Sequence, residues 1–248
     1  MVAVDNLSLQ LYTVRHKLEE DFDATLARIA EIGYTKVEPF GVVGFADQLA
    51  EALPKYGLSA PTTHAGLLRE DSGPIFEVAK KLGITTVIDP FVDPARWQSA
   101  EDIKATAEAL NKAAAEAADH GITVGYHNHH FELESVIDGV HGLEILVDNL
   151  SDEVILEVDT YWAAVGGADV PALLGRLGDR VKALHVKDGD GTLDNKAQVA
   201  VGDGTIAVID ILKAAPTALR VVELDDFSGE IFDAVAGSFT YLTGEDVA

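Results

Sequence analysis

The sequence predicts an α/β protein that folds as a single (β/α)8, or TIM, barrel. Short apolar runs rich in β-branched residues alternate along the chain with segments of helical period, and eight of each can be distinguished. Strands separated by helices run parallel and are joined by right-handed crossovers. Eight such units fit a chain of 248 residues, which is a usual length for this barrel.

The expected strands are apolar, and a polar residue stands at or next to the carboxyl end of each. They cover residues 7–11, 36–39, 59–64, 85–89, 122–127, 154–158, 181–186 and 220–224. The expected helices carry apolar residues three or four positions apart, and several end at a glycine, which favours a left-handed cap. They cover residues 21–32, 46–56, 74–82, 100–120, 139–149, 170–177, 207–214 and 230–242.

An open, doubly wound sheet is the main alternative fold. Such a sheet rarely needs eight units, and the glycine-rich pyrophosphate turn is missing after the first strand, where Tyr12-Thr13-Val14-Arg15 stands instead. No Pro/Gly/Ser-rich linker, low-complexity block or sharp shift in composition divides the chain. We therefore expect residues 1–248 to form one domain.

The net charge is −24, from 18 Lys and Arg against 42 Asp and Glu, and it disfavours polyanionic partners. A nucleic acid or an anionic membrane surface would be repelled, so the charge serves solubility. The absence of cysteine excludes disulfides and thiolate metal sites. No apolar run has the length of a membrane span, and the first residues lack the features of a secretory signal. We expect a cytoplasmic protein.

An unusual polar stretch, Tyr126-His127-Asn128-His129-His130-Phe131-Glu132, follows the apolar strand that begins at Ile122. Ionisable groups are costly to desolvate unless they are paired or bind a metal. In a TIM barrel, the residues that meet a substrate lie at the carboxyl ends of the strands. The stretch therefore predicts part of a site at the barrel mouth.

The last four expected strands each bring one metal-binding side chain to their carboxyl ends. Glu132, Asp159, His185 and Glu223 would converge as three carboxylates and one imidazole. This donor set suits Mn²⁺ or Mg²⁺, and also accepts Co²⁺, Fe²⁺ or Zn²⁺. Three carboxylates would repel one another without a cation. A solvated rim of charges would explain any one of these residues, but it explains all four less well.

Proton transfer at this site has several candidate groups. We expect Glu223 to be a metal ligand and a base, with His127, Glu132 or His64 as its partner acid or base. Other polar and aromatic residues near strand ends are expected to contact the substrate: Gln10, Tyr12, Arg15, Glu38, His129, Trp162 and Lys187. The ammonium of Lys187 would hold a substrate oxygen or simply neutralise Asp188. Trp162 would stack on a sugar face or pack in the core.

Several of these motifs together resemble the xylose isomerase-like TIM barrels, specifically the sugar phosphate isomerase/epimerase family and its ketose 3-epimerase and inosose dehydratase relatives. The motifs span nearly the whole chain, and they are specific for the superfamily rather than for one substrate. They are Leu9-Gln10-Leu11-Tyr12-Thr13-Val14-Arg15, Val37-Glu38-Pro39-Phe40-Gly41, Tyr126 to Glu132, Val158-Asp159-Thr160-Tyr161-Trp162, Leu184-His185-Val186-Lys187-Asp188 and Val222-Glu223.

The resemblance implies a metal set of Glu, Asp, His and Glu, in which Asp159, His185 and Glu223 match. The chain departs from the family at the remaining position, because His127 stands where ketose epimerases usually carry a glutamate. The dehydratase relatives have a histidine-rich motif that is closer to this one. Either Glu132 reaches back as the ligand, or His127 or His129 takes its place.

The implied chemistry is removal of a proton from a carbon next to a carbonyl. Returning the proton elsewhere isomerises or epimerises a sugar, whereas expelling a β-hydroxyl dehydrates a keto-polyol. A non-catalytic sugar-binding barrel is the third hypothesis. The acidic charge argues against an endonuclease IV-like role. Few basic residues lie at strand ends, which favours an unphosphorylated sugar. The sequence leaves the substrate and the oligomeric state open, and a homo-oligomer is compatible with it.

Overall fold

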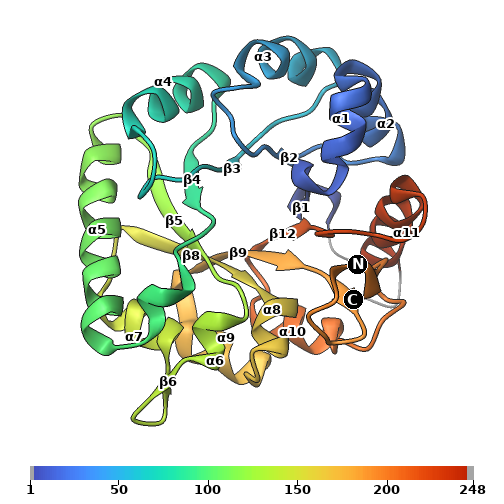
Figure 1. The fold of residues 1–248 in the computed structure, drawn as a ribbon. Coiled ribbons are helices and arrows are strands. Elements are labelled where there is room, and N and C mark those ends of the chain that lie inside the picture. The colour runs from blue at the N-terminus through green and yellow to red at the C-terminus, as the bar shows by residue number, and fades with distance from the viewer. Residues whose placement is uncertain (1–2, 245–248) are drawn as a thin grey trace.

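The computed structural model describes residues 3–244 and confirms the TIM barrel (Figure 1). Eight parallel strands form one sheet in the order β2-β1-β12-β9-β8-β5-β4-β3. These strands are β1 (Leu7–Gln10), β2 (Val37–Glu38), β3 (Thr62–His64), β4 (Thr86–Asp89), β5 (Thr123–His127), β8 (Val154–Asp159), β9 (Val181–Val186) and β12 (Leu219–Val222).

The two end strands of this order, β2 and β3, lie side by side and nearly close the barrel. Lys36 bridges Ser59 and Phe40 bridges His64, both in parallel register. The amide of His64 donates to the carbonyl of Pro39 at 2.8 Å. Closure leaves few free strand edges, so the backbone polar groups of the sheet are largely satisfied within it.

Helices surround the sheet, with one or two after each strand, whereas the sequence predicts a single helix after each. Aspartate or serine side chains cap several of them, as Asp21 does by accepting from the amide of Ala24. Within residues 3–244 no helix is both long and apolar enough to span a bilayer. The helices are α1 (Arg15–Glu20), α2 (Phe22–Ile32), α3 (Ala46–Lys55), α4 (Ser72–Leu82), α5 (Ala100–Ala118), α6 (Phe131–Glu134), α7 (Gly142–Asn149), α8 (Thr160–Val165), α9 (Val170–Leu177), α10 (Val208–Ala214) and α11 (Ile231–Thr243).

The segment after β5 differs from the expected single helix over 139–149. It begins with the short helix α6 and a hairpin of β6 (Val136–Ile137) and β7 (Val140–His141), and only then enters α7. Asp138 and Gly139 both have positive φ, as a two-residue hairpin turn requires. The Asp-Gly pair was the available sequence signal. This local fold matters because Glu132 lies on α6, away from the end of β5.

Strand register brings the expected site residues to one edge of the barrel. Asp159 pairs with His185, and His127 pairs with Glu157 on the neighbouring strand. Because side chains alternate along a strand, Glu157 and Asp159 point to the same side, one layer apart. All of these residues are buried, so the barrel interior near its carboxyl end is a polar layer rather than an apolar core.

Asp188 organises the long loop between β9 and α10. Its carboxylate accepts hydrogen bonds from the amides of Gly189, Gly202, Gly204 and Ile206, at 2.9 to 3.1 Å. A side chain at position 204 would collide with Asp188, since a Cβ there would lie 2.1 Å from Oδ1. The loop is therefore wrapped around one buried carboxylate.

Replacing this carboxylate should destabilise the fold. Asp188→Asn puts an NH2 group where two amides now find an acceptor, so we expect a loss of about 2 kcal/mol or more in the free energy of unfolding. Urea denaturation measures it. Asp203→Asn, at an exposed position in the same loop, is the matched control and should change stability little. Equal stability of the two variants would contradict this role for Asp188.

Candidate active site

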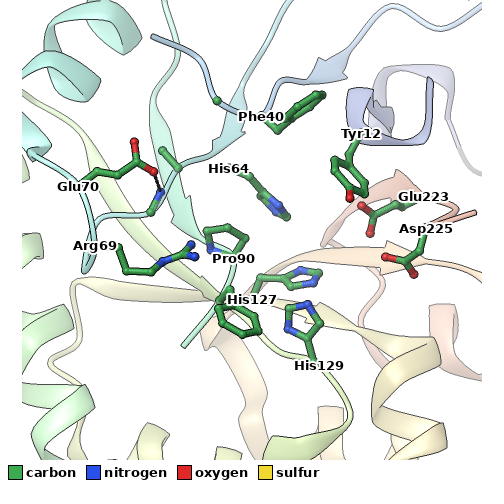
Figure 2. Close-up of a pocket in the computed structure, with 14 residues that line it drawn as sticks. Tyr12, Phe40, His64, Arg69, Glu70, Pro90, His127, His129, Glu223 and Asp225 are labelled. Atoms are coloured by element: carbon green, nitrogen blue, oxygen red, sulfur yellow. Dashed lines mark hydrogen bonds between the residues drawn. The ribbon is translucent and has the colours of Figure 1, made fainter. Parts of the chain in front are cut away.

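A cavity of about 430 Å³ opens at the carboxyl end of the barrel, within the range of small-molecule sites (Figure 2). Tyr12, Phe40, Arg69, Glu70 and Phe91 line it from the loops after the first four strands. Figure 2 shows the rings of His64, His127 and His129 in the middle, with Glu223 and Asp225 to one side of them and Arg69 to the other.

Two overlapping groups of four side chains could hold a metal ion. One is His64, His127, Glu157 and His185, and the other, here called the metal cluster, is His127, Asp159, His185 and Glu223. Each offers one nitrogen or oxygen, and these atoms lie within 4.8 Å of one another. Nε2 of His127 is 3.7 Å from Oδ2 of Asp159, and Nδ1 of His185 is 2.6 Å from Oε2 of Glu223. The cluster thus contains three of the four expected ligands, with His127 in place of Glu132.

Local backbone structure fixes Asp159. Its Oδ1 caps α8 by accepting from the amide of Trp162 at 2.9 Å. The side chain of Asn128 bridges to the backbone of Asp159, accepting from its amide at 3.1 Å and donating to its carbonyl at 3.3 Å. These contacts leave Oδ2 directed toward the cluster.

Lys187 neutralises the carboxylates of the site rather than Asp188. Its Nζ lies 2.9 Å from Oδ2 of Asp159 and 2.7 Å from both Glu223 and Asp225. Residues two positions apart share a face of an extended chain, which places Lys187 on the same side as His185. Burial alone would lower the pKa of Lys187, but the three carboxylates raise it well above its usual range.

Glu132 is held outside the cluster. Its Oε1 accepts from the hydroxyl of Tyr126 at 2.6 Å, and its Oε2 accepts from the amide of His129 at 2.9 Å. Burial raises the pKa of Glu132 to about 8. A buried carboxyl with both oxygens already bonded serves to shape the turn after β5.

The remaining expected residues divide between the cavity and its surroundings. Tyr12 and His129 line the cavity. Gln10 and Glu38 are buried beneath it and bond to each other at 2.8 Å. Arg15 stacks on Tyr12 and donates to its carbonyl, outside the cavity wall. Trp162 is buried on α8, with Lys187 over its ring.

Sequence reasoning missed Glu157, Asp225 and Arg69. Glu157 is fully buried and its Oε2 lies within 3.1 Å of three histidine rings. Its spacing of two from Asp159 was the available signal, since i and i+2 share a face of a strand. Asp225 lies two positions after Glu223. Arg69 is on an irregular loop after β3, where no pattern marks it.

The charges of the site are strongly perturbed. Burial raises the pKa of Asp159 to about 6, despite Lys187 and His185. Burial would also raise the pKa of Glu223, but Lys187 and His185 hold it well below its usual value. Burial, aided by Lys187, lowers the pKa of His129 to about 4. At neutral pH, Glu223 is therefore a carboxylate and His129 a neutral imidazole.

The cluster fits a divalent cation. Oδ2 of Asp159 is fully buried and makes no hydrogen bond within the described residues, although Lys187 is close enough for an ion pair. Asp159, Glu223 and Asp225 share the single ammonium of Lys187, while Glu38 and Glu157 contact only imidazoles among the described ionisable groups that could balance them. Buried charges of one sign need compensation, and imidazole and carboxylate donors are common ligands of divalent metals.

Glu132 should make stability depend on pH. Its pKa rises from a usual value of 4.5 to about 8 on folding, so its contribution is fully present below about pH 4.5 and is lost as the pH rises through 8. Relative to Glu132→Gln, the wild type should lose at least about 1.4 kcal/mol between pH 5 and 9, the equivalent of one pKa unit. Urea denaturation at several pH values tests this, and parallel curves would contradict it.

Solved structures share this fold. A sugar phosphate isomerase/epimerase from Parabacteroides distasonis is 24% identical with a TM-score of 0.81, over 97% of this chain and 94% of that one. The probable 3-DHS dehydratase AsbF from Bacillus anthracis is 16% identical with a TM-score of 0.76, over 96% and 99%. An IolI protein with bound zinc is 18% identical with a TM-score of 0.72, over 97% of each chain. Such identities show the fold alone.

No protein of curated function matches the chain in sequence. A family model does match, and it is described as the xylose isomerase-like TIM barrel. The match covers residues 26–226, which include His127, Asp159, His185 and Glu223. The chain therefore belongs to the xylose isomerase-like TIM barrel family.

Proposed function

We propose that this protein is a divalent-metal-dependent isomerase or epimerase of a sugar or keto-sugar. The observation that carries the proposal is the convergence of two imidazoles and two carboxylates beside a buried lysine, at a cavity of small-molecule size that two of them, His127 and Glu223, line. The family includes solved relatives named as isomerases, epimerases and dehydratases. The cavity and its charges favour proton transfer on a small polar substrate.

The metal would be held by His127, Asp159, His185 and Glu223. The sequence predicted three carboxylates and one imidazole, whereas this set has two of each. The second imidazole changes which metal is preferred, because imidazole favours Mn²⁺, Fe²⁺, Co²⁺ or Zn²⁺ over Mg²⁺. When bound, such an ion polarises a substrate carbonyl and stabilises the negative charge that develops on its oxygen. The IolI relative with zinc shows that a member of this fold group accepts such an ion.

The chain supplies two groups suited to moving a proton at the cavity. Glu223 is ionised, because Lys187 and His185 hold its pKa low, so its carboxylate can accept a proton from carbon. His129 lines the cavity as a neutral imidazole, and its buried Nδ1 has no hydrogen-bond partner within residues 3–244. His129 is therefore placed to accept a proton or to hold a substrate hydroxyl. His64 also lines the cavity and remains a candidate partner, whereas both ring nitrogens of His127 are engaged, Nε2 by the metal cluster and Nδ1 by Glu157.

Dehydration of a keto-polyol is the second candidate function. The histidine-rich end of β5 favours it, since His129 lines the cavity as a neutral imidazole that can donate a hydrogen bond to the departing hydroxyl of a bound keto-polyol. The relative named as a 3-DHS dehydratase shares the fold over 96% of this chain. Isomerisation and dehydration share the first step, the removal of a proton next to a carbonyl, and they diverge afterwards.

The cavity walls favour an uncharged sugar over a phosphorylated one. Among the described residues that line it, Arg69 is the one lysine or arginine, and the nearby Lys187 is already engaged by three carboxylates. Tyr12, Phe40 and Phe91 offer aromatic faces on which a sugar ring can stack. The net charge of −24 further favours a small-molecule substrate over a nucleic acid.

Competition between a ketose and its phosphate ester tests the preference for an uncharged sugar. Tighter binding of the ester would contradict it.

The choice between His127 and Glu132 as the ligand from the β5 region is directly testable. We expect His127→Asn to weaken Mn²⁺ binding by about tenfold or more, because the cluster loses one of its four donors. Glu132→Gln should bind Mn²⁺ nearly as tightly as the wild type, since both oxygens of Glu132 are bonded elsewhere. Isothermal titration calorimetry measures both affinities. The opposite order of effects would restore Glu132 as the ligand.

The proposed reaction predicts exchange of carbon-bound hydrogen with solvent. The wild type, supplied with Mn²⁺ and a panel of ketoses in deuterated water, should incorporate deuterium next to the carbonyl without loss of water. Asp159→Asn should lower the rate by about a hundredfold, as expected for loss of a charged group at the reacting centre. Proton NMR and mass spectrometry follow the label.

The outcomes separate the three hypotheses. Deuterium incorporation into a product that has not lost water supports isomerase or epimerase chemistry. An unsaturated product that has lost water supports the dehydratase. Substrate binding without exchange supports a non-catalytic sugar-binding barrel and would overturn the proposal. Full exchange activity of Asp159→Asn would overturn the role of the metal cluster in the reaction.

A further inference from the structure

Glu157 lies at the centre of a buried layer of histidines beneath the metal cluster. Its Oε2 is 2.6 Å from Nε2 of His64, 3.1 Å from Nδ1 of His127 and 3.1 Å from Nε2 of His185. The side chain is completely buried, and it does not line the cavity. Glu157 therefore acts on the rings around it rather than on a substrate.

The carboxylates of this layer contact the two histidines of the metal cluster, His127 and His185, at different ring nitrogens. His127 meets Glu157 through Nδ1, which leaves Nε2 facing Asp159. His185 meets Glu38 at 2.8 Å and Glu157 through Nε2, which leaves Nδ1 facing Glu223. In each ring, the nitrogen away from the layer is the one that faces the cluster.

We propose that Glu157, assisted by Glu38, is a positioning residue that sets which nitrogen of each ligand histidine is free to bind metal. A carboxylate that accepts a proton from one ring nitrogen fixes the tautomer and the orientation of the imidazole. Glu157 thereby directs the lone pair of His127 Nε2 toward Asp159. Glu38 and Glu157 together hold Nε2 of His185, so that Nδ1, which contacts Glu223, is the nitrogen that gives up its proton when a metal binds. This inference rests on the proposed metal-binding function.

The structure suggests a variant that keeps the shape of this layer. Oε1 of Glu157 makes no hydrogen bond within residues 3–244, so Glu157→Gln adds an NH2 group without removing a contact of that atom. The amide either accepts from His127 more weakly than a carboxylate does, or turns its NH2 group toward Nδ1 and forces the proton onto Nε2. Both outcomes weaken the control of the tautomer.

The first measurement is nitrogen-15 NMR of the full-length, metal-free protein, with histidine signals assigned through single substitutions. In the wild type, His127 should carry its ring proton on Nδ1. In Glu157→Gln, we expect the proton to move at least partly to Nε2. Glu38→Gln should leave the proton of His127 on Nδ1, because Glu38 contacts His185 instead. A wild-type His127 that is protonated only on Nε2 would overturn the inference.

The second measurement is the affinity for Co²⁺, followed by its absorption spectrum. Glu157→Gln should bind Co²⁺ about 10- to 100-fold more weakly than the wild type, the usual effect of losing a partner of a ligand histidine. The matched control is Asp89→Asn. Asp89 is equally buried at the end of β4, but its oxygens accept from the amides of Leu68 and Phe91. This control should keep the wild-type affinity.

The two measurements fail independently. If the folded Glu157→Gln protein binds Co²⁺ as tightly as the wild type, or if Asp89→Asn weakens binding equally, the positioning role is overturned. Circular dichroism and the midpoint of urea denaturation establish that each variant is folded. If the wild type itself binds no Co²⁺, the proposed function fails, and the tautomer of His127 then decides whether Glu157 orients that ring.

Discussion

The burial of carboxylates at the mouth of the barrel is the constraint on which the site depends. A carboxylate removed from water must find a donor, a cation or a proton. Each of the three solutions occurs here. Asp188 is satisfied by backbone amides, Glu223 by Lys187 and His185, and Glu132 by a pKa raised to about 8. The arrangement of histidines, lysine and amides follows from where the acids lie.

The acids are compensated differently according to depth. The deeper layer, with Glu38 and Glu157, is balanced mainly by imidazoles. The upper layer, with Asp159, Glu223 and Asp225, shares one ammonium. An imidazole contacts an acid through one nitrogen and leaves the other for a second partner, whereas an ammonium is surrounded by its acids. The deeper layer is thus suited to aligning ligands, and the upper layer to holding a cation.

The sequence predicted the barrel well because its signals are redundant, with eight repeats of the same alternation. It also placed Asp159, His185 and Glu223 together, because parallel register brings the carboxyl ends of the strands to one edge. Glu132 was harder, because the chain turns into α6 after His127 and carries Glu132 toward Tyr126. The pattern of hydrophobic residues does not predict such a turn.

The missed residues have equally physical reasons. Glu157 stands inside an apolar strand, whereas the sequence prediction considered only residues at strand ends. Its spacing of two residues from Asp159 nevertheless indicates that both side chains point into the barrel. The partner of Lys187 was misplaced, because Asp188 points to the other side of the chain and binds the amides of its own loop. Arg69 lies on an irregular loop, whose path depends on long-range contacts that no local pattern encodes.

The residues around the cavity come from two halves of the barrel, and the two halves have separate roles. The residues of the metal cluster lie on β5, β8 and β9 and directly after β12, whereas Tyr12, Phe40, Arg69 and Phe91 come from loops after β1 to β4. Loops tolerate substitution and insertion more readily than strands do. Inherited changes in the first half can therefore alter which molecule is admitted while the second half keeps its chemistry. In this architecture, the molecule that the cavity admits can change while the metal cluster stays the same.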